Sequence, residues 1–235
     1  MAAVLLLGWL ISLISFLRID LLALPLWTLV LIVLLRTTVQ TGLFITAHDA
    51  MHGLIVPTRP GWNHSLGALF LGLYAGLAYR PCLRKHHRHH AYSGSPLDPD
   101  FCVDRSAGAV GWYFRFMGGY LSPGQMTRLL AFWCLLGWIF ASTHPGIWIN
   151  LLLICVLPLV LSSLQLFVFG TYLPHRSQQG PDAEEGPRSL DLPGWLSLLT
   201  CFHFGYHRAH HDHPHLAWFQ LPSVHCPRPG LLAAS

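Results

Sequence analysis

Histidine is concentrated in three short motifs of a chain that is otherwise mostly apolar. The motifs are HDAMHG (48–53), HHRHH (86–90) and YHRAHH (206–211). On a helix, residues at positions i, i+3 and i+4 share one face, about one turn apart. Three sets have this spacing: His48 and His52; His86, His89 and His90; and His207, His210 and His211. His87 would point to another side of its helix.

The spacing predicts a metal site. Neutral imidazole is a common ligand of iron, zinc, copper and nickel, which accept about four to six ligands each. Eight facing histidines exceed what one ion needs, so two ions sharing them is the preferred interpretation. A single motif of this kind could be a solvated basic face, but three motifs with helical spacing favour ligands. The remaining histidines flanked by loop-like sequence are expected to be structural: His64, His213, His215 and His225.

Carboxylates are absent from the facing positions. Soluble di-iron bundles use glutamates, whereas an all-imidazole site needs nearby anions to orient the rings and fix their tautomers. Asp49 and Asp212, each beside a motif histidine, are the candidates, although a solvated or helix-capping role explains either one equally well. Asp98 and Asp100, in SPLDPDF, could do similar work or simply form the turn, and the turn is the preferred interpretation.

Composition places this site in a membrane. The 235 residues are 53% hydrophobic and only 10% charged, with a mean hydropathy of +0.46, whereas soluble domains carry about 25% charged residues. A spanning helix needs about 20 mostly apolar residues, and four stretches approach that length: 3–17, 21–47, 129–143 and 147–173. The first is interpreted as a retained helix, because no small-residue cleavage site follows it. The sequence therefore predicts a single all-α membrane domain over 1–235.

A fifth apolar segment, Leu66 to Tyr79, is too short to cross the membrane and return. Because histidine motifs lie on both sides of it, we expect it to be re-entrant or interfacial. The two helices joined by Ser142 to Gly146 would cross the membrane and return, which would place His175 on the same side of the membrane as the motifs. Of the 14 Lys and Arg residues, only Arg18 lies in the opposite loop and only Arg36 within a helix, so the positive-inside rule predicts a cytoplasmic histidine face.

Three other features carry less information. A buried charge at Arg36 is functional, snorkelling or paired within the bundle, and the sequence does not choose between these. The six cysteines form no CxxC pair and are expected to be free thiols. The polar stretch from Ser177 to Arg188 is expected to be a solvated loop. No nucleic-acid pattern is present, and topology alone explains the net charge of +4.

The motifs and their neighbours resemble a known family. A first histidine pair followed by two HxxHH motifs, spread over apolar helices, is similar to the membrane fatty acid desaturase and hydroxylase superfamily. The segments HDAMHG, RKHHRHHAYSG with DPDF, FGTYLPHR and HFGYHRAHHDHPHLAWFQLP resemble the bacterial-type β-carotene ketolases over nearly the whole chain. The HxxHH motifs are shared by many lipid oxygenases, whereas FGTYLPHR and the run from Cys201 to Pro222 are far more specific.

The resemblance implies two iron ions, O2 as co-substrate and electrons from a ferredoxin-type donor, in a bacterial inner or thylakoid-type membrane. It carries the ligand role to the eight motif histidines and adds His175, in FGTYLPHR, as a ninth. His203 would act behind the ligands or through water. Arg208 and Ala209 occupy the variable positions of the third motif, where the family often has an acidic residue, so a contact behind the ligands is expected to differ here.

The activity that the resemblance implies is oxidation of ring carbon 4 of β-carotene to a ketone, giving echinenone and then canthaxanthin. The substrate would enter an apolar slot from the bilayer. Six aromatic residues are candidates for gripping its ring, although each could be ordinary core or interface: Phe169, Tyr172, Phe204, Tyr206, Trp218 and Phe219. The alternatives are a fatty acyl desaturase or alkane hydroxylase, a carotenoid 3-hydroxylase and, outside enzymes, a membrane metal transporter. A transporter would show polar residues at mid-membrane depth, whereas these histidines lie at predicted helix ends.

Overall fold

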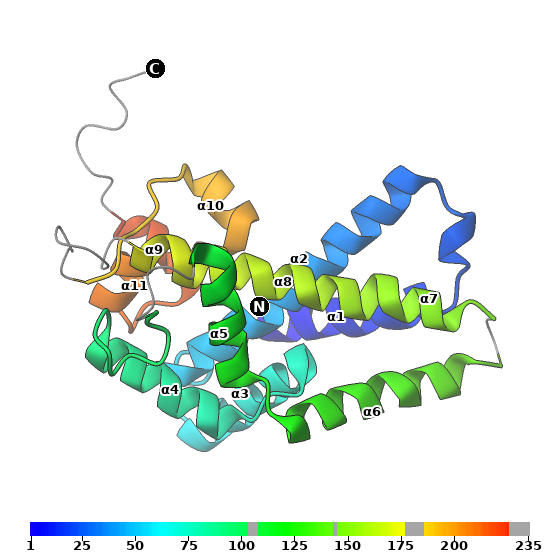
Figure 1. Cartoon of the computed structure of the whole chain (residues 1–235), viewed down its shortest axis with the longest axis horizontal. Helices are drawn as coiled ribbons and strands as arrows, with labels where there is room; N and C mark the ends of the chain where they lie inside the picture. Colours follow the sequence, from blue (N-terminus) through cyan, green and yellow to red (C-terminus); the bar gives the residue numbers. More distant parts are fainter. Residues whose placement is uncertain (103–107, 143–144, 177–185, 226–235) are drawn as a thin grey trace. The chain divides into compact units, whose positions relative to one another are not determined.

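The computed structural model describes residues 1–102, 108–142, 145–176 and 186–225. Every regular element in these ranges is helical, which confirms the all-α prediction (Figure 1). The longer helices are α1 (Ala2–Leu17), α2 (Leu26–Met51), α3 (Pro60–Ala75), α4 (Tyr79–Tyr92), α5 (Gly108–Tyr120), α6 (Pro123–Phe140), α8 (Leu157–Leu166) and α10 (Gly194–Cys201). The shorter ones are η1 (Leu21–Ala23), α7 (Ile147–Leu151), η3 (Leu152–Val156), η4 (Phe167–Tyr172), α9 (Leu173–His175), α11 (His207–Asp212) and η6 (Trp218–Ser223).

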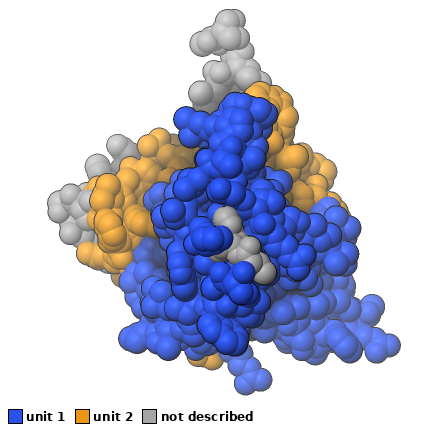
Figure 2. Space-filling model, turned by 90° about the vertical axis from the view of Figure 1, so that its right-hand side faces the viewer, with its two compact units in different colours: residues 1–83, 116–164 blue, residues 84–115, 165–235 orange. Residues whose placement is uncertain are grey.

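The chain divides into two compact units, which Figure 2 colours separately. Unit 1 comprises Met1–Leu83 and Phe116–Leu164, and unit 2 comprises Arg84–Arg115 and Gln165–Ser235. Unit 1 holds most of the predicted spanning sequence, and unit 2 holds the second and third histidine motifs. The single domain predicted over 1–235 stays a prediction.

Two helical segments in the described residues are long and apolar enough to cross a membrane. They are Leu26–Met51 and Ile147–His175, and the second runs through two π-helical turns, η3 and η4. The bent pair α3 and α4 would raise the number to three, and α1 is a shorter apolar helix. Residues 129–140 of the predicted stretch 129–143 belong to α6, which begins earlier at Pro123 and includes Gln125 and Arg128, and residue 143 lies outside the described residues. The four predicted spans are therefore only partly confirmed.

Close packing of α3 against α2 organises unit 1. A Cβ atom on Gly67 of α3 would come within 2.7 Å of the Ala50 Cβ on α2 and within 2.5 Å of the Tyr79 ring. Glycine is therefore needed at this crossing, because any side chain would push the helices apart. The contact fixes α3 beside the part of α2 that carries the first histidine motif, because Ala50 lies within that motif.

Side chains cap the carbonyl end of α3, where the chain bends by 99° into α4. Gln40 Nε2 donates to the Tyr74 carbonyl, and Gln125 Nε2 donates to the Ala75 carbonyl at 3.1 Å. Arg128 Nη2 donates to the Gly76 carbonyl at 2.9 Å, and Gly76 takes the left-handed conformation that ends many helices. Backbone groups in a bilayer must be satisfied internally, so these caps are what a helix ending within a membrane requires. The prediction of a re-entrant or interfacial piece at 66–79 agrees with this bend, and its side of the membrane stays a prediction.

Arg36 is buried in unit 1 at 1% exposure and pairs with backbone from two other helices. Its Nε donates to the Ile154 carbonyl at 3.0 Å, and its Nη1 donates to the Trp9 carbonyl at 2.9 Å and to Ser12 Oγ at 2.8 Å. The guanidinium also lies 5.5 Å from the centre of the Trp9 ring. Ile154 is in the π-helical turn η3, where the regular helical hydrogen-bond pattern is interrupted. Of the alternatives left open by the sequence, pairing within the bundle is the one observed.

A tight turn presents the third histidine motif in unit 2. Helix α10 ends in left-handed backbone at Phe202 (φ 51°) and His203 (φ 60°), an uncommon conformation for residues other than glycine. Tyr206, Ala209 and Leu221 then form a small buried core beneath α11. The histidines of α11 thus sit on a short helix that is anchored along one side.

Candidate metal centre

Four histidines of unit 2 converge on one point. His89 comes from α4, His175 from α9, and His207 and His211 from α11. One ring nitrogen of each lies within 4.8 Å of those of the other three, and the first three side chains are buried. Side chains from three separate segments of the chain therefore meet, as the sequence predicts for this part of the ligand set.

The separations of the ring nitrogens are those of ligands sharing an ion. His89 Nε2 lies 3.3 Å from His207 Nε2 and 3.1 Å from His211 Nε2, and the last two atoms are 3.1 Å apart. Each ring nitrogen either donates or accepts a hydrogen bond. Among three nitrogens that all contact one another, at least two must be of the same kind, so hydrogen bonds cannot account for all three contacts. Nitrogens bound to one ion at about 2.0–2.1 Å lie about 3 Å from each other. The donor set therefore fits a metal ion.

The electrostatics of the cluster keep two of its rings, those of His207 and His211, neutral. Burial, and then the neighbouring imidazoles, hold the pKa of His207 and the pKa of His211 well below the ordinary histidine value. A neutral imidazole has a lone pair to offer, which is the form that binds a metal. His207 Nδ1 is buried without a hydrogen-bond partner.

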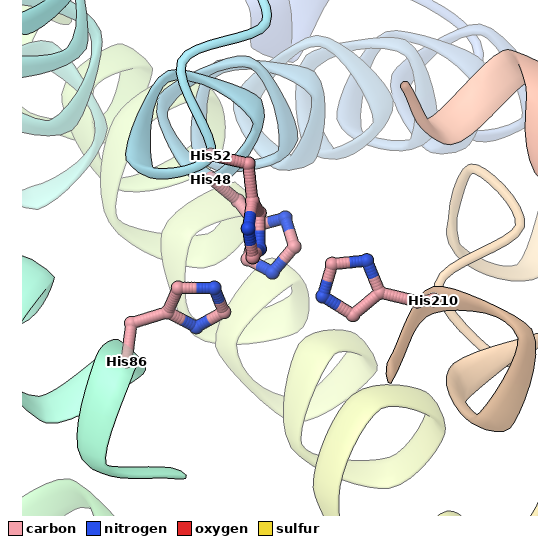
Figure 3. Close-up of side chains that lie close together, drawn as sticks. All are labelled: His48, His52, His86 and His210. Carbon is pink, nitrogen blue, oxygen red and sulfur yellow. The ribbon is translucent and has the colours of Figure 1, made fainter. Parts of the chain in front are cut away.

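A second group of histidines lies in the same unit. His90 Nε2 is 3.0 Å from His210 Nε2, and the His86 ring centre is 4.6 Å from that of His90 and 6.1 Å from that of His210. Figure 3 shows His86 on α4 and His210 on α11. His87 is exposed, as the helical register predicts. The i, i+3, i+4 spacing thus separates the second motif into converging rings and one outward ring.

The first motif forms its own pair in unit 1. His48 lies in the last turn of α2 and His52 caps that helix. Their ring centres are 5.2 Å apart, and Figure 3 shows the two rings side by side. The predicted i, i+4 pairing is therefore confirmed within this unit.

Asp98 provides the anion behind the four-histidine cluster. His89 Nδ1 donates to Asp98 Oδ1 at 2.9 Å, and the backbone N–H groups of Gly94 and Asp100 donate to the same carboxylate. Burial opposes ionisation of this carboxyl, but the hydrogen bond and charge of His89 and the backbone donors outweigh it and lower the pKa of Asp98. The interpretation of Asp98 as a turn residue was incomplete, because it holds the turn and also contacts a candidate ligand.

The other predicted polar residues have different environments. Asp212 is exposed, and its ion pair is with Arg208 at 3.6 Å, so of the two roles left open by the sequence its environment is that of a solvated aspartate. Its side chain leaves α11 on the solvent side. Asp49 is buried on the last turn of α2. His203 stacks on Tyr206 at 5.4 Å and, in the described residues, joins no group of converging metal donors.

Phe204, one of the predicted substrate-gripping residues, contacts this cluster in unit 2. Its ring meets that of His207 edge-on at 5.7 Å between centres, and it occupies the space above Gly170. A Cβ on Gly170 would lie 2.1 Å from that ring. Glycine in FGTYLPHR therefore makes room for Phe204.

The remaining predicted aromatics fall into separate groups. Tyr206 is a core residue whose hydroxyl donates to the Leu192 carbonyl at 2.7 Å, which is the core environment that the sequence left open for it, and its assignment to the substrate stays a prediction. Trp218 packs on Phe219, and Phe219 is 51% exposed. Phe169 is half-buried.

Tyr172 joins an aromatic cluster that the sequence interpretation missed: Trp112, Tyr113 and Phe167, with ring centres of neighbouring members 5.3–6.2 Å apart. The run GWYFRF was the available signal, but α5 was not among the predicted helices.

Comparison with known proteins supplies the family context. The family model described as fatty acid desaturase matches residues 23–231. The chain is 43% identical over 198 residues to a beta-carotene ketolase of Paracoccus sp. (strain N81106 / MBIC 01143), covering 80% of this chain and 75% of that protein. It is 39% identical over 195 residues to a beta-carotene ketolase of Haematococcus lacustris, covering 80% and 58%. It is 36% identical over 197 residues to a zeaxanthin 4-ketolase of Chlamydomonas reinhardtii, covering 77% and 40%.

Proposed function

The chain belongs to the fatty acid desaturase family, and we propose that it is a carotenoid ketolase that oxidises carbon 4 of β-ionone rings. The observation that carries this proposal is 36–43% identity to relatives named as carotenoid ketolases, over about four fifths of the chain. Relatives named as sphingolipid desaturases match at only 26% identity, which disfavours an acyl desaturase. The same relatives are enzymes by name, which disfavours a metal transporter.

The reaction consists of two hydroxylations at one carbon. The ring methylene at carbon 4 is allylic, so its C–H bonds are weak. Each hydroxylation consumes one O2, two electrons and two protons, inserts one oxygen atom into a C–H bond and releases one water. The second gives a geminal diol, which loses water to leave the ketone. Applied to both rings of β-carotene, the sequence yields echinenone and then canthaxanthin.

The metal is proposed to be iron, in two ions held by the nine histidines that the family pattern designates: His48, His52, His86, His89, His90, His175, His207, His210 and His211. The nitrogen spacing in unit 2 fits a metal ion, and the choice of iron rests on the family. When bound, the ions would supply the activation of O2. The electrons would come from a ferredoxin-type donor, and the site would face the cytoplasm.

The residues around the histidines have distinct tasks in this proposal. Burial keeps His207 neutral and excludes water from its side of the cluster. Phe204, which contacts His207 edge-on, is the residue best placed to pack against an apolar ring. A hydrocarbon has no charge to bind, so affinity must come from apolar contact, at about 25 cal/mol per Å² buried.

Pigment analysis tests the proposal. Cells that accumulate β-carotene and express the chain should produce a monoketone and then a diketone, with traces of the 4-hydroxy intermediate, because each ketone needs two rounds of oxidation. Cells expressing the His89→Ala variant at equal level serve as the control and should keep β-carotene. Recovery of 3-hydroxylated rings or newly desaturated acyl chains, with no ketone, would refute the assignment.

Isotope labelling tests the source of the oxygen. Growth under 18O2 should place label in the ketone, partly diluted because a geminal diol can lose either oxygen and the ketone exchanges with water. A ketone that carries no label at the shortest sampling times would contradict an O2-dependent mechanism.

A further inference from the structure

We propose that Asp98 is a positioning residue of the metal centre, which fixes the tautomer and orientation of His89 so that Nε2 faces the ion. The inference deepens the proposed function, because it concerns the same site and rests on that site binding iron. No substrate contact is assigned to Asp98. Its effect is exerted through His89.

The geometry assigns opposite tasks to the two ring nitrogens of His89. Nδ1 donates to Asp98 Oδ1 at 2.9 Å, whereas Nε2 lies within 3.3 Å of His207 Nε2 and His211 Nε2. A neutral imidazole carries one proton. With the proton held on Nδ1 by the carboxylate, the lone pair of Nε2 is directed into the cluster.

Burial makes this contact specific. The side chains of His89 and Asp98 are 5% and 1% exposed. The nearest carboxylate oxygen of Asp100 is 3.8 Å from His89 Nδ1, which is too far for a hydrogen bond. Asp98 is therefore the carboxylate that His89 engages directly, and water has little access to replace it.

The loop that carries Asp98 is held in place independently of the histidines. Backbone N–H groups of Gly94 and Asp100 donate to the two oxygens of Asp98, at 3.1 and 2.9 Å. Arg88 Nη2 donates to the Leu97 carbonyl, and Trp112 Nε1 donates to the Asp100 carbonyl, both at 3.0 Å. These bonds prevent the carboxylate from rotating, so the ring it binds is held in one orientation.

The consequence for the metal follows from general coordination chemistry. A carboxylate that accepts from the far nitrogen of a ligating imidazole makes the near nitrogen more basic and orients the ring, and its loss costs about 10–100-fold in metal affinity. A purely structural role of Asp98 in closing the loop would not depend on its negative charge. Charge is therefore the property to vary.

The test measures iron affinity on the purified full-length protein in detergent, with Fe²⁺ as the probe and a chelator as competitor. Asp98→Asn keeps the shape and an acceptor oxygen but removes the charge. We expect Asp98→Asn to lower affinity about 10–100-fold and to change the Mössbauer quadrupole splitting of bound 57Fe. Ser95→Ala is the matched control, because it removes the Leu97 N–H to Ser95 Oγ bond of the same loop without touching His89, and it should leave affinity and spectrum unchanged.

Two results would overturn the inference. One is wild-type affinity and spectrum in Asp98→Asn, and the other is an equal loss in Ser95→Ala, which would point to the loop alone. If Asp98→Asn does not fold, Asp98→Glu and Asp98→Gln form a second pair that differs only in charge, and the Glu variant should bind iron more tightly. Equal iron affinities of the Glu and Gln variants would also overturn the inference. An iron-binding wild type that makes no ketone would refute the proposed function and leave this inference standing.

Discussion

His87 and His89 are two positions apart on α4, yet their surroundings differ completely. His89 is 4% exposed and converges with three other imidazoles, whereas His87 is exposed. Membership of a motif is therefore not sufficient to place a histidine in the cluster, because its position on the helix decides which way the ring points.

This contrast predicts unequal effects of substitution. His89→Ala or His207→Ala should lose most of the bound iron and at least 100-fold of ketone formation, because removing a ligand leaves a vacancy in the coordination sphere. His87→Ala should retain iron and most of the activity. Metal analysis and pigment yield on folded protein check this. A His87→Ala protein that is folded but as inactive as the other two would mean that the functional register of the second motif is wrong.

Asp212 shows that a residue adjacent to a motif histidine in the sequence can still point away from the cluster. It follows directly after His211, yet its side chain is 60% exposed and pairs with Arg208 on the next turn. Exposed pairs of this kind contribute about 0–1 kcal/mol.

We therefore expect Asp212→Asn to leave iron content unchanged and ketone formation within about twofold of wild type, because the exposed pair contributes so little. Comparison with Asp98→Asn in the same pigment assay is the check. A large loss in the Asp212 variant alone would restore the role that the sequence suggested for it.

At the scale of elements, two unusual features of the helices each have an identifiable partner. The π-helical turn η3 carries the Ile154 carbonyl that Arg36 binds, and the π-helical turn η4 contains Gly170, over which Phe204 packs. Irregular helical turns need partners for groups that the regular pattern no longer satisfies. Arg36 supplies such a partner at η3, whereas at η4 Phe204 fills the space beside Gly170.

Arg36→Met should lower the thermal stability of unit 1. The substitution removes the guanidinium donors to the Trp9 and Ile154 carbonyls. Hydrogen bonds to charged groups contribute about 1.5–3 kcal/mol each, and their loss corresponds to a fall in Tm of several degrees. Thermal unfolding in detergent measures it. Arg18→Met, which removes an exposed charge from the same unit, is the control and should change Tm little. Equal Tm values for the two variants would contradict the stabilising role of Arg36.

Gly170→Ala should destabilise the protein by about 1–3 kcal/mol, because the new methyl group would overlap the Phe204 ring. Adding Phe204→Ala should remove most of that penalty, so the double variant should be more stable than the sum of the two single effects. Gly72→Ala is the control, since open space surrounds that position on α3. Strict additivity of the two changes in Tm would show that the residues are not in contact.

Part of this architecture follows from sequence alone. Helical periodicity is local, so the spacing within each motif was sufficient to predict which imidazoles converge. Contacts between distant segments have no such local signal: Arg36 binds backbone 27 and 118 residues away. Asp98 reaches His89 through a loop whose path the spacing does not fix, and α5 has too mixed a composition to stand out as an apolar span.

For the whole molecule, the membrane and the metal place linked demands on one short chain. Leu26–Met51 and Ile147–His175 are the described segments suited to crossing a bilayer, and each ends in a histidine that the family pattern assigns to metal. Under the proposed function, ligands at the ends of spanning helices would place oxidation of a carotenoid ring at the edge of the apolar layer.

The central claim is that the nine histidines together hold two irons, and the iron content of the pure protein tests it most directly. Chain produced in iron-replete cells and purified in detergent should contain two iron atoms per chain, with chain concentration from amino-acid analysis, because nine imidazoles oversupply a single ion. His87→Ala should give the same value. One iron or fewer per chain at full occupancy would contradict the account.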